Sequence, residues 1–323
     1  MKATRAKPPE GRSEVELSAV IVAVTQDQPR VLTVPAEAGV GPEDHPALPA
    51  GPLDPAGDRT LDLALRRWVS RQTGMELGYV EQLYTFGDRF RDPGERRGGP
   101  RVLSVAYLAL VREGEIPAGM VARWRNVYDF FPWEDWRAGR PGALDELVHP
   151  QLRAWVANGE DAAARSQRRE RAAVTFGFGG APWDRDRALE RFELLYEMEL
   201  VGVEGGGGSR LGYPMALDHR RMLATALGRI RGKIKYRPVV FELMPELFTL
   251  LRLQRTVEAL SGVRLHKQNF RRLVGRAGLV EGTGRLEEGH RGRPAELFSF
   301  RRAVLLERPA PGVGLPSAGP GGG

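Results

Sequence analysis

The 323-residue chain contains no cysteine. Disulfide bonds, thiolate zinc sites and cysteine nucleophiles are therefore excluded. Histidine is scarce as well, and the spacing of the five histidines matches no metal-binding pattern and pairs none of them with an obvious nucleophile. They are His45, His149, His219, His266 and His290. The sequence thus predicts no metal and no catalytic residue.

Long apolar runs are also missing. No stretch approaches the ~18 to 20 apolar residues that a membrane span needs. The first residues, MKATRAKPPEGRSEVE, lack the apolar core of a signal peptide. The four glycines Gly205 to Gly208 are not followed by the Lys-Ser/Thr pair of a phosphate-binding P-loop. We expect a cytoplasmic protein without a membrane partner, and 41% hydrophobic with 28% charged residues indicates a soluble globular one.

Basic and acidic residues are unevenly distributed along the chain. The whole chain has 48 Lys+Arg against 41 Asp+Glu. Residues 219–308 hold 20 of the basic and 8 of the acidic residues, which leaves 28 basic and 33 acidic residues elsewhere. A basic third attached to a mildly acidic body is typical of proteins that neutralise nucleic-acid phosphates. A solvated basic surface without such a partner is the alternative.

The length is sufficient for about two domains. We expect a flexible arm at 1–14, a first domain at 15–202 and a glycine-rich linker at 203–217. A second domain follows at 218–308, and a disordered tail at 309–323.

In the first domain, alternating apolar residues around the turn TQDQPR predict a β-hairpin over Val15–Val34. The Pro/Gly-rich stretch Pro35–Gly57 is expected to be an irregular loop. Thr60 and Gly74 flank an amphipathic helix at Leu61–Gln72, and strands are predicted at Val80–Phe86 and Val102–Val111.

The rest of the first domain is less regular. A helix is predicted at Leu189–Val201, while Asn126–Arg185 fits no motif apart from a charged helical segment.

The second domain begins with a helix that Asp218 would cap and that would end near Ile230. Its outer face would carry Arg220, Arg221, Arg229 and Arg231. The following segment RGKIKYRPVVFEL alternates like a strand.

Two short helices then follow. Thr249 opens the first, Gly262 ends it, and the second spans about His266 to Arg276. Leu279 and Val280 would begin a two-stranded wing. This order of helices and strands predicts a winged helix-turn-helix.

The second of these helices has a polar and basic exposed face. Phe270, Leu273, Val274 and Ala277 recur at helical spacing and must face the core. The exposed side chains would be those of His266, Lys267, Gln268, Asn269, Arg271, Arg272 and Arg276. Arg or Lys pairs with guanine and Asn or Gln with adenine in the major groove, so we predict binding to double-stranded DNA. Arg291 and Arg293 at the wing tip are candidates for phosphate or minor-groove contacts. A domain that binds protein through the same basic rim is the alternative.

The helix of the first domain resembles the end of the Nudix box, whose pattern is Arg-Glu-apolar-x-Glu-Glu-x-Gly. Arg67, Val69 and Gly74 match it, while Trp68, Arg71 and Gln72 replace the three glutamates. In Nudix hydrolases those glutamates hold the divalent metals that polarise a pyrophosphate. The resemblance therefore implies a Nudix-like α/β/α sandwich with a degenerate box.

The whole chain resembles the Nudix-related transcriptional regulators of NAD metabolism, the NrtR family, and most of all their longer actinobacterial-type branch. Segments such as YVEQLYTFGDRFRDP, VLSVAYLALV, LDHRRMLATALGRIRGKIKY and LHKQNFRRLVGRAGLVEGTG carry the resemblance. It implies an α/β protein with a C-terminal winged helix, acting as a homodimeric repressor of NAD biosynthesis or salvage genes. The resemblance further implies an ADP-ribose or related NAD-derived effector and no cofactor. Whether that effector releases or promotes DNA binding stays open.

The resemblance places the effector near TFGDR, where a ring could stack on adenine and arginines could neutralise a diphosphate. The candidates are Arg67, Arg71, Phe86, Asp88, Arg89 and Arg101. A non-enzyme is expected. The alternative is an active nucleotide pyrophosphatase with a displaced metal site at Glu76 or Glu81.

Overall fold

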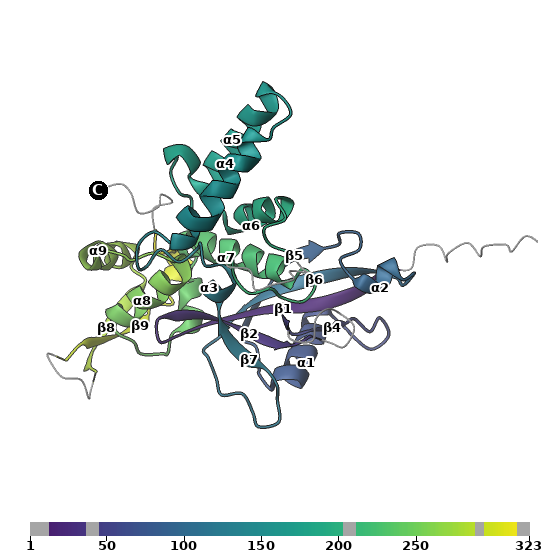
Figure 1. Cartoon of the computed structure of the whole chain (residues 1–323). Coiled ribbons are helices and arrows are strands. Elements are labelled where there is room, and N and C mark those ends of the chain that lie inside the picture. The colour runs from purple at the N-terminus through teal and green to yellow at the C-terminus, as the bar shows by residue number, and fades with distance from the viewer. Residues whose placement is uncertain (1–12, 37–44, 203–210, 288–293, 315–323) are drawn as a thin grey trace, which may run out of the picture.

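The structure, a computed structural model, describes residues 13–36, 45–202, 211–287 and 294–314 (Figure 1). Within these ranges a seven-stranded mixed sheet runs in the order β3-β2-β1-β6-β5, with β4 paired to β1 and β7 to β2. The strands are β1 (Ser13–Thr25), β2 (Gln28–Pro35), β3 (Pro46–Ala47), β4 (Ala50–Pro52), β5 (Tyr79–Phe86), β6 (Arg101–Leu110) and β7 (Arg123–Asn126).

The first two strands form the predicted hairpin. Gln26 and Asp27 at its tip have φ of 50° and 60°, which suits the two-residue turns that follow the twist of a hairpin. Along its other edge, β1 pairs in parallel with β6, so the hairpin lies in the middle of the sheet.

Helices cover both faces of this sheet. Leu17, Ala19 and Ile21 point to one face and pack with α1 (Leu61–Thr73). Val20 and Val22 point to the other face, toward α7 (His219–Tyr236) and α6 (Ala188–Glu197). The predicted α/β/α sandwich is confirmed.

The stretch that fits no sequence motif is largely helical. Its elements are α3 (Val127–Phe130), a π-helical turn (Leu144–Val148), α4 (His149–Ala157), α5 (Ala162–Phe176) and a short 3-10 turn (Phe178–Gly180). Asp161 caps α5, and Gly177 ends it with φ 62°. Helices α4 and α5 project together from the body of the molecule (Figure 1).

Helix α7 is longer than predicted and replaces the expected strand. It continues to Tyr236, because Leu227, Ile230 and Ile234 keep helical spacing through the alternating segment and remain buried. A 3-10 turn at Val239–Leu243 follows Pro238. The cap prediction was also wrong, since Asp218 makes no capping bond and pairs instead with Arg91 at 2.7 Å.

The C-terminal part is a winged helix-turn-helix, as predicted. It contains α8 (Leu250–Ser261), α9 (Lys267–Ala277), the paired strands β8 (Val280–Leu286) and β9 (Glu296–Phe300), and α10 (Val304–Glu307). The Thr249 hydroxyl accepts from the Arg252 amide, and Gly262 ends α8 with φ 72°. Both predicted helix boundaries are confirmed.

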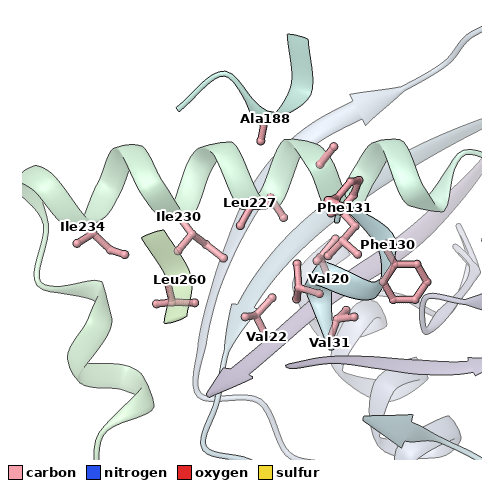
Figure 2. Packing of buried hydrophobic residues seen from close by; sticks show 14 of the residues in the cluster. Val20, Val22, Val31, Phe130, Phe131, Ala188, Leu227, Ile230, Ile234 and Leu260 are labelled. Atoms are coloured by element: carbon pink, nitrogen blue, oxygen red, sulfur yellow. The ribbon is translucent and has the colours of Figure 1, made fainter. Parts of the chain in front are cut away.

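One hydrophobic cluster runs from the sheet into the winged helix. It includes Val20 and Val22 of β1, Leu227 and Ile230 of α7, and Leu260 of α8 (Figure 2). Phe270 and Val274 of α9 belong to the same cluster. Helix α7 therefore packs on the sheet and on the winged helix-turn-helix at once.

Three segments are more ordered than the sequence indicates. The expected loop at 35–57 contributes β3 and β4, and Met215, Ala216 and Leu217 of the expected linker are buried. Val313, within the expected tail, is 1% exposed, and its amide donates to the Ile234 carbonyl at 2.9 Å. The glycines 205–208 lie outside the described residues. No helix in the described ranges is long and apolar enough to cross a bilayer.

Candidate functional site

Helix α9 displays one continuous polar and basic face. Phe270 and Val274 are 1% exposed and hold the helix against α8, which turns the opposite face to solvent. All seven side chains predicted for this face are exposed, namely His266, Lys267, Gln268, Asn269, Arg271, Arg272 and Arg276. The Arg272 guanidinium donates to the Asn269 side-chain oxygen at 3.2 Å. The structure thus brings guanidinium and amide groups together on one exposed face, and such groups are of the kind that can pair with base edges in a major groove.

Beside α9 stands the wing. β8 and β9 pair antiparallel from Val280↔Phe300, and Arg285 on β8 is exposed. Arg291 and Arg293, predicted at the wing tip, lie outside the described residues. His266 takes the N-cap position of α9 without a side-chain capping bond.

In the Nudix-like helix α1, residues that stand in place of the glutamates make other contacts. The Trp68 indole donates to the Pro52 carbonyl at 2.9 Å, and its ring lies so close to Gly51 that a Cβ there would collide with it. Gln72 forms amide hydrogen bonds with both the N–H and the carbonyl of Ala50, at 3.0 and 2.8 Å. The positions of the lost glutamates therefore anchor the short strand β4.

A divalent metal does not fit this helix. Where carboxylates would be needed there are an indole, a guanidinium and an amide, and Arg71 lies 5.5 Å from the Trp68 ring centroid. Glu76 accepts from Ser70, and Glu81 is paired with Lys233. Across the described residues no group of three His, Asp or Glu side chains could hold a metal ion.

The six predicted effector residues fall on two sides of the sheet. Arg67 and Arg71 belong to α1, and Arg67 is paired with Asp58. Phe86 is 2% exposed and packs in the cluster on the α7 side, where the Arg221 guanidinium lies 5.9 Å from its ring.

The other three candidates lie at the start of β6 and on the loop after β5. Arg101 donates to the Gly87 carbonyl, which holds the start of the loop after β5. Asp88 and Arg89 on that loop line a pocket. Of the six, these two line this pocket together.

The pocket has a volume of about 1000 Å³ and lies between the loop 88–96, α6 and the start of α7. Phe192 and Tyr196 of α6 supply aromatic surface, while arginines come from the loop and from α7. Arg221 is paired with both Glu193 and Asp88, and these acids, with burial opposing, raise its pKa. The volume is at the upper end of that of small-molecule sites.

Arg220 is a buried cation in the wall of this pocket. It is 4% exposed, and its described hydrogen bonds go to the backbone carbonyls of Phe130 and Leu211. Burial lowers its pKa to about 9, so the guanidinium is still charged at neutral pH. The guanidinium also lies 5.6 Å from the ring centroids of Phe131, Trp133 and Phe192, and no described ion pair neutralises it, so an anion would stabilise this buried charge further. The nearby Arg91 adds a buried guanidinium nitrogen with no hydrogen-bond partner among the described residues.

The sequence prediction of a solvent-facing arginine row on α7 was therefore wrong at Arg220 and Arg231, which are 4% and 3% exposed. Sequence reasoning also missed Glu193 and Tyr196 as pocket residues. One feature of the sequence could have indicated that the arginines of α7 are held by other groups. Two arginines in the first turn of a helix are opposed by the helix dipole, which indicates that other groups hold them.

The fold and these sites together define a class of protein: a Nudix-fold domain with a degenerate metal site, joined to a winged helix-turn-helix with an exposed basic helix face. Residues 240–300 match the family model described as the NrtR DNA-binding winged helix domain.

Full-length comparisons agree. The chain is 24% identical over 280 residues to the "ADPR responsive transcriptional repressor NtrR" of Acinetobacter baylyi, covering 87% of this chain and 79% of that protein. The crystal structure of Shewanella oneidensis NrtR complexed with a 27mer DNA matches with a TM-score of 0.55 at 21% identity, covering 90% of this chain and 94% of that one. A MutT/nudix family protein from Enterococcus faecalis matches with a TM-score of 0.55 at 18% identity, over 92% and 90% of the two chains. The predicted resemblance to the Nudix-related NrtR regulators is confirmed.

Proposed function

We propose that this protein is a DNA-binding transcriptional repressor of NAD biosynthesis or salvage genes, whose operator affinity responds to ADP-ribose or a related NAD-derived nucleotide. The exposed face of α9 carries the proposal, because a helix with seven exposed basic, amide and imidazole positions is presented by a buried apolar face. The names of the relatives, a repressor responsive to ADPR and a regulator crystallised on DNA, support the same function. A repressor of this kind would act in the cytoplasm, where its DNA partner lies.

We assign base contacts to α9 and phosphate contacts to the wing. Arg271, Arg272 and Lys267 would pair with guanine, and Gln268 and Asn269 with adenine. Arg276 and His266 at the two ends of the helix would reach phosphates, as would Arg291 and Arg293. Two chains form a dimer whose α9 helices lie about one DNA turn apart on a pseudo-palindromic site.

The effector would occupy the pocket between loop 88–96, α6 and α7. Its diphosphate would neutralise Arg220 and Arg89, and Tyr196, which is half exposed, offers an aromatic surface for adenine. The competing location is on α1, at Arg67 and Arg71. Phe86 and Asp88 lie on or near the pocket side, and Arg101 donates to the Gly87 carbonyl where the loop begins.

A binding experiment distinguishes the two proposed locations of the effector, the pocket and α1. Binding of ADP-ribose is measured by calorimetry for wild type, Arg89→Ala and the double variant Arg67→Ala/Arg71→Ala. We expect Arg89→Ala to weaken ADP-ribose binding about tenfold and the double variant to bind like wild type. The reverse pattern would place the effector against α1.

The functional test combines DNA and effector in one assay. A fluorescent duplex that the protein itself selects from random DNA is titrated with the chain, with and without ADP-ribose. We expect specific binding and a change of operator affinity of roughly 5- to 150-fold, the usual range of allosteric coupling. Indifference to every duplex would leave the winged helix as a protein-binding module and end the proposal.

We also propose that the chain is no hydrolase. Incubation with ADP-ribose and Mg²⁺ or Mn²⁺ should release no AMP above the background, because α1 offers no carboxylate cage for the metals. Brisk AMP release would support the alternative of a pyrophosphatase with a displaced metal site.

A further inference from the structure

The segment 128–137, which we call the bridge, touches both the pocket and the helix-turn-helix. At one end the carbonyl of Phe130 accepts two hydrogen bonds from Arg220, and the Trp133 ring centroid lies 5.6 Å from the same guanidinium. At the other end the Trp136 amide donates to the Gly262 carbonyl at 2.7 Å. Gly262 ends α8 and begins the turn that leads into α9.

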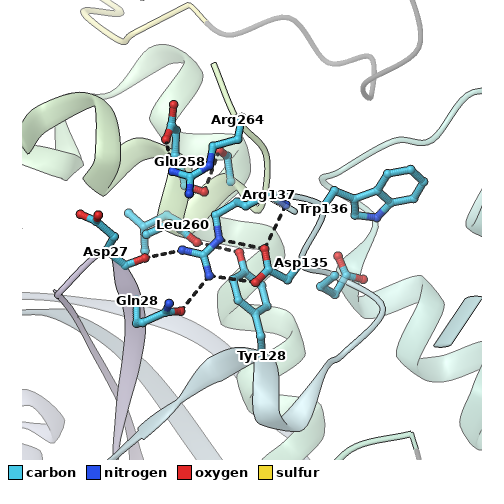
Figure 3. Close-up of polar contacts among 12 residues, drawn as sticks. Asp27, Gln28, Tyr128, Asp135, Trp136, Arg137, Glu258, Leu260 and Arg264 are labelled. Carbon is cyan, nitrogen blue, oxygen red and sulfur yellow. Dashed lines mark hydrogen bonds and ion pairs between the residues drawn. The ribbon is translucent and has the colours of Figure 1, made fainter. Parts of the chain in front are cut away.

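More bonds tie the bridge to the last turn of α8. The Tyr128 hydroxyl donates to the Ala259 carbonyl at 2.6 Å. The bridge also holds the β1–β2 hairpin tip, because Arg137 donates to the Gln28 side chain at 2.8 Å and to the Asp27 carbonyl (Figure 3). The C-terminal end of α8, the first helix of the helix-turn-helix, is thus fixed by groups that lie outside the winged helix domain.

Glu134 is the centre of the bridge and is 1% exposed. Its carboxylate accepts from Arg191 of α6 at 2.5 and 3.0 Å, and also from Arg231 of α7. Arg231 in turn donates to the Leu260 carbonyl at the end of α8 at 3.2 Å. Arg191 directly precedes Phe192 and Glu193 in the pocket wall.

The carboxylate stays charged in this environment. Burial alone would raise the pKa of Glu134, but the two arginines outweigh burial and hold the pKa below its usual range. Removing a charge from such a buried network changes how firmly its members hold one another.

We propose that Glu134 is a positioning residue that couples the effector pocket to the helix-turn-helix. A ligand that moves α6 or draws on Arg220 shifts the bridge, and the bridge carries the shift to the turn before α9. This inference rests on the proposed function, since it assigns to the 128–137 segment the connection between its two sites.

The test uses the full chain and measures a ratio, the operator Kd with saturating ADP-ribose divided by the operator Kd without it. Glu134→Gln keeps the size of the side chain and removes its charge. We expect the operator Kd without ADP-ribose and the ADP-ribose Kd without DNA to stay within about threefold of wild type, while the ratio falls toward 1. By linkage, the affinity for ADP-ribose then becomes the same for free and DNA-bound protein.

Glu258→Gln is the matched control. Glu258 is an equally buried glutamate within α8, paired with Arg264 and bonded to the Leu265 amide, and no described hydrogen bond or ion pair joins it to α6 (Figure 3). We expect this variant to change operator affinity equally with and without effector, so that its ratio equals that of wild type.

A folded Glu134→Gln protein that keeps the wild-type ratio overturns the inference. If that variant does not unfold cooperatively on heating, Tyr128→Phe decides in its place, because it removes one hydroxyl, which bonds to the Ala259 carbonyl and to Arg231, and leaves the Glu134 carboxylate with both arginines. A reduced ratio supports the bridge and an unchanged ratio rejects it. A wild-type protein without any response to ADP-ribose would instead refute the proposed function itself.

Discussion

At the scale of single residues, the DNA-binding face of α9 is the most direct object of mutation. Arg271 and Arg272 are exposed, and their truncation leaves the buried Phe270 and Val274 in place. We expect Arg271→Ala or Arg272→Ala to weaken operator binding by about 1 to 3 kcal/mol if the arginine contacts a base. A phosphate contact would instead lower the slope of log K against log salt by about one.

Effector affinity should stay at the wild-type value in both variants, as measured by calorimetry. Arg169→Ala removes an equally exposed arginine from α5 and serves as the charge control. Joint loss of DNA and effector binding would contradict separate sites.

His219 is one residue that makes stability depend on pH. Its Nδ1 accepts from the Leu48 amide at 3.0 Å, so its proton is on Nε2 and the buried ring is neutral. Burial lowers its pKa below 6.5, while Glu16 and Asp218 oppose the shift. The unfolded chain therefore takes up a proton first as pH falls, and stability decreases below pH 6.5 until the folded pKa is reached.

We expect a loss of up to about 1.4 kcal/mol of unfolding free energy per pH unit in that window from this group. His219→Gln should flatten the pH dependence below pH 6.5, measured by urea unfolding. The same slope in both proteins would assign the effect to the other histidines.

At the scale of elements, helix α7 depends on a segment far along the chain. The amides of Val313 and Gly314 donate to the carbonyls of Ile234 and Lys235 at 2.9 and 3.0 Å. They satisfy the last turn of the helix, whose carbonyls have no intrahelical partner.

Deleting residues 310–323 should destabilise the protein by about 2 to 4 kcal/mol, from the buried Val313 side chain and the two lost hydrogen bonds. Deleting only 315–323 keeps both bonds and is the control. Thermal unfolding measures the difference, and equal melting temperatures would show that the segment contributes nothing to α7.

Helix ends and buried helix faces were predictable where the identity or the spacing of nearby residues decides them. Thr249, Gly262 and the apolar spacing of Phe270 and Val274 specify α8 and α9 within a few neighbouring residues. The segment RGKIKY was mispredicted as a strand because its apolar residues fit both the period of a strand and the period of a helix. Only the packing of Ile230 and Ile234 beside α8 favours the helix. β4 was missed since it has three residues and exists through its pairing with β1.

At the scale of the whole molecule, the core is continuous from β1 through α7 to α9. We therefore expect one cooperative unfolding transition, in which the winged helix melts with the sheet. Calorimetry with and without ADP-ribose tests this. Ligand at about 100 times its Kd should shift the single peak by about 2.7 kcal/mol of stability.

Intrinsic fluorescence and far-UV circular dichroism should report the same midpoint. Two separated transitions, of which ADP-ribose raises only one, would show that the winged helix is independent of the sheet.

The sequence by itself determined the periodic helices, the hairpin, the basic character of residues 219–308 and the replacement of the Nudix glutamates, because each depends on neighbours or on residue identity alone. Tertiary structure decided which charges are buried and with what partners. Glu134 meets Arg231 across 97 residues and Arg91 meets Asp218 across 127. Such pairings follow from how α6, α7 and the bridge pack, and no local pattern encodes a contact between residues so far apart.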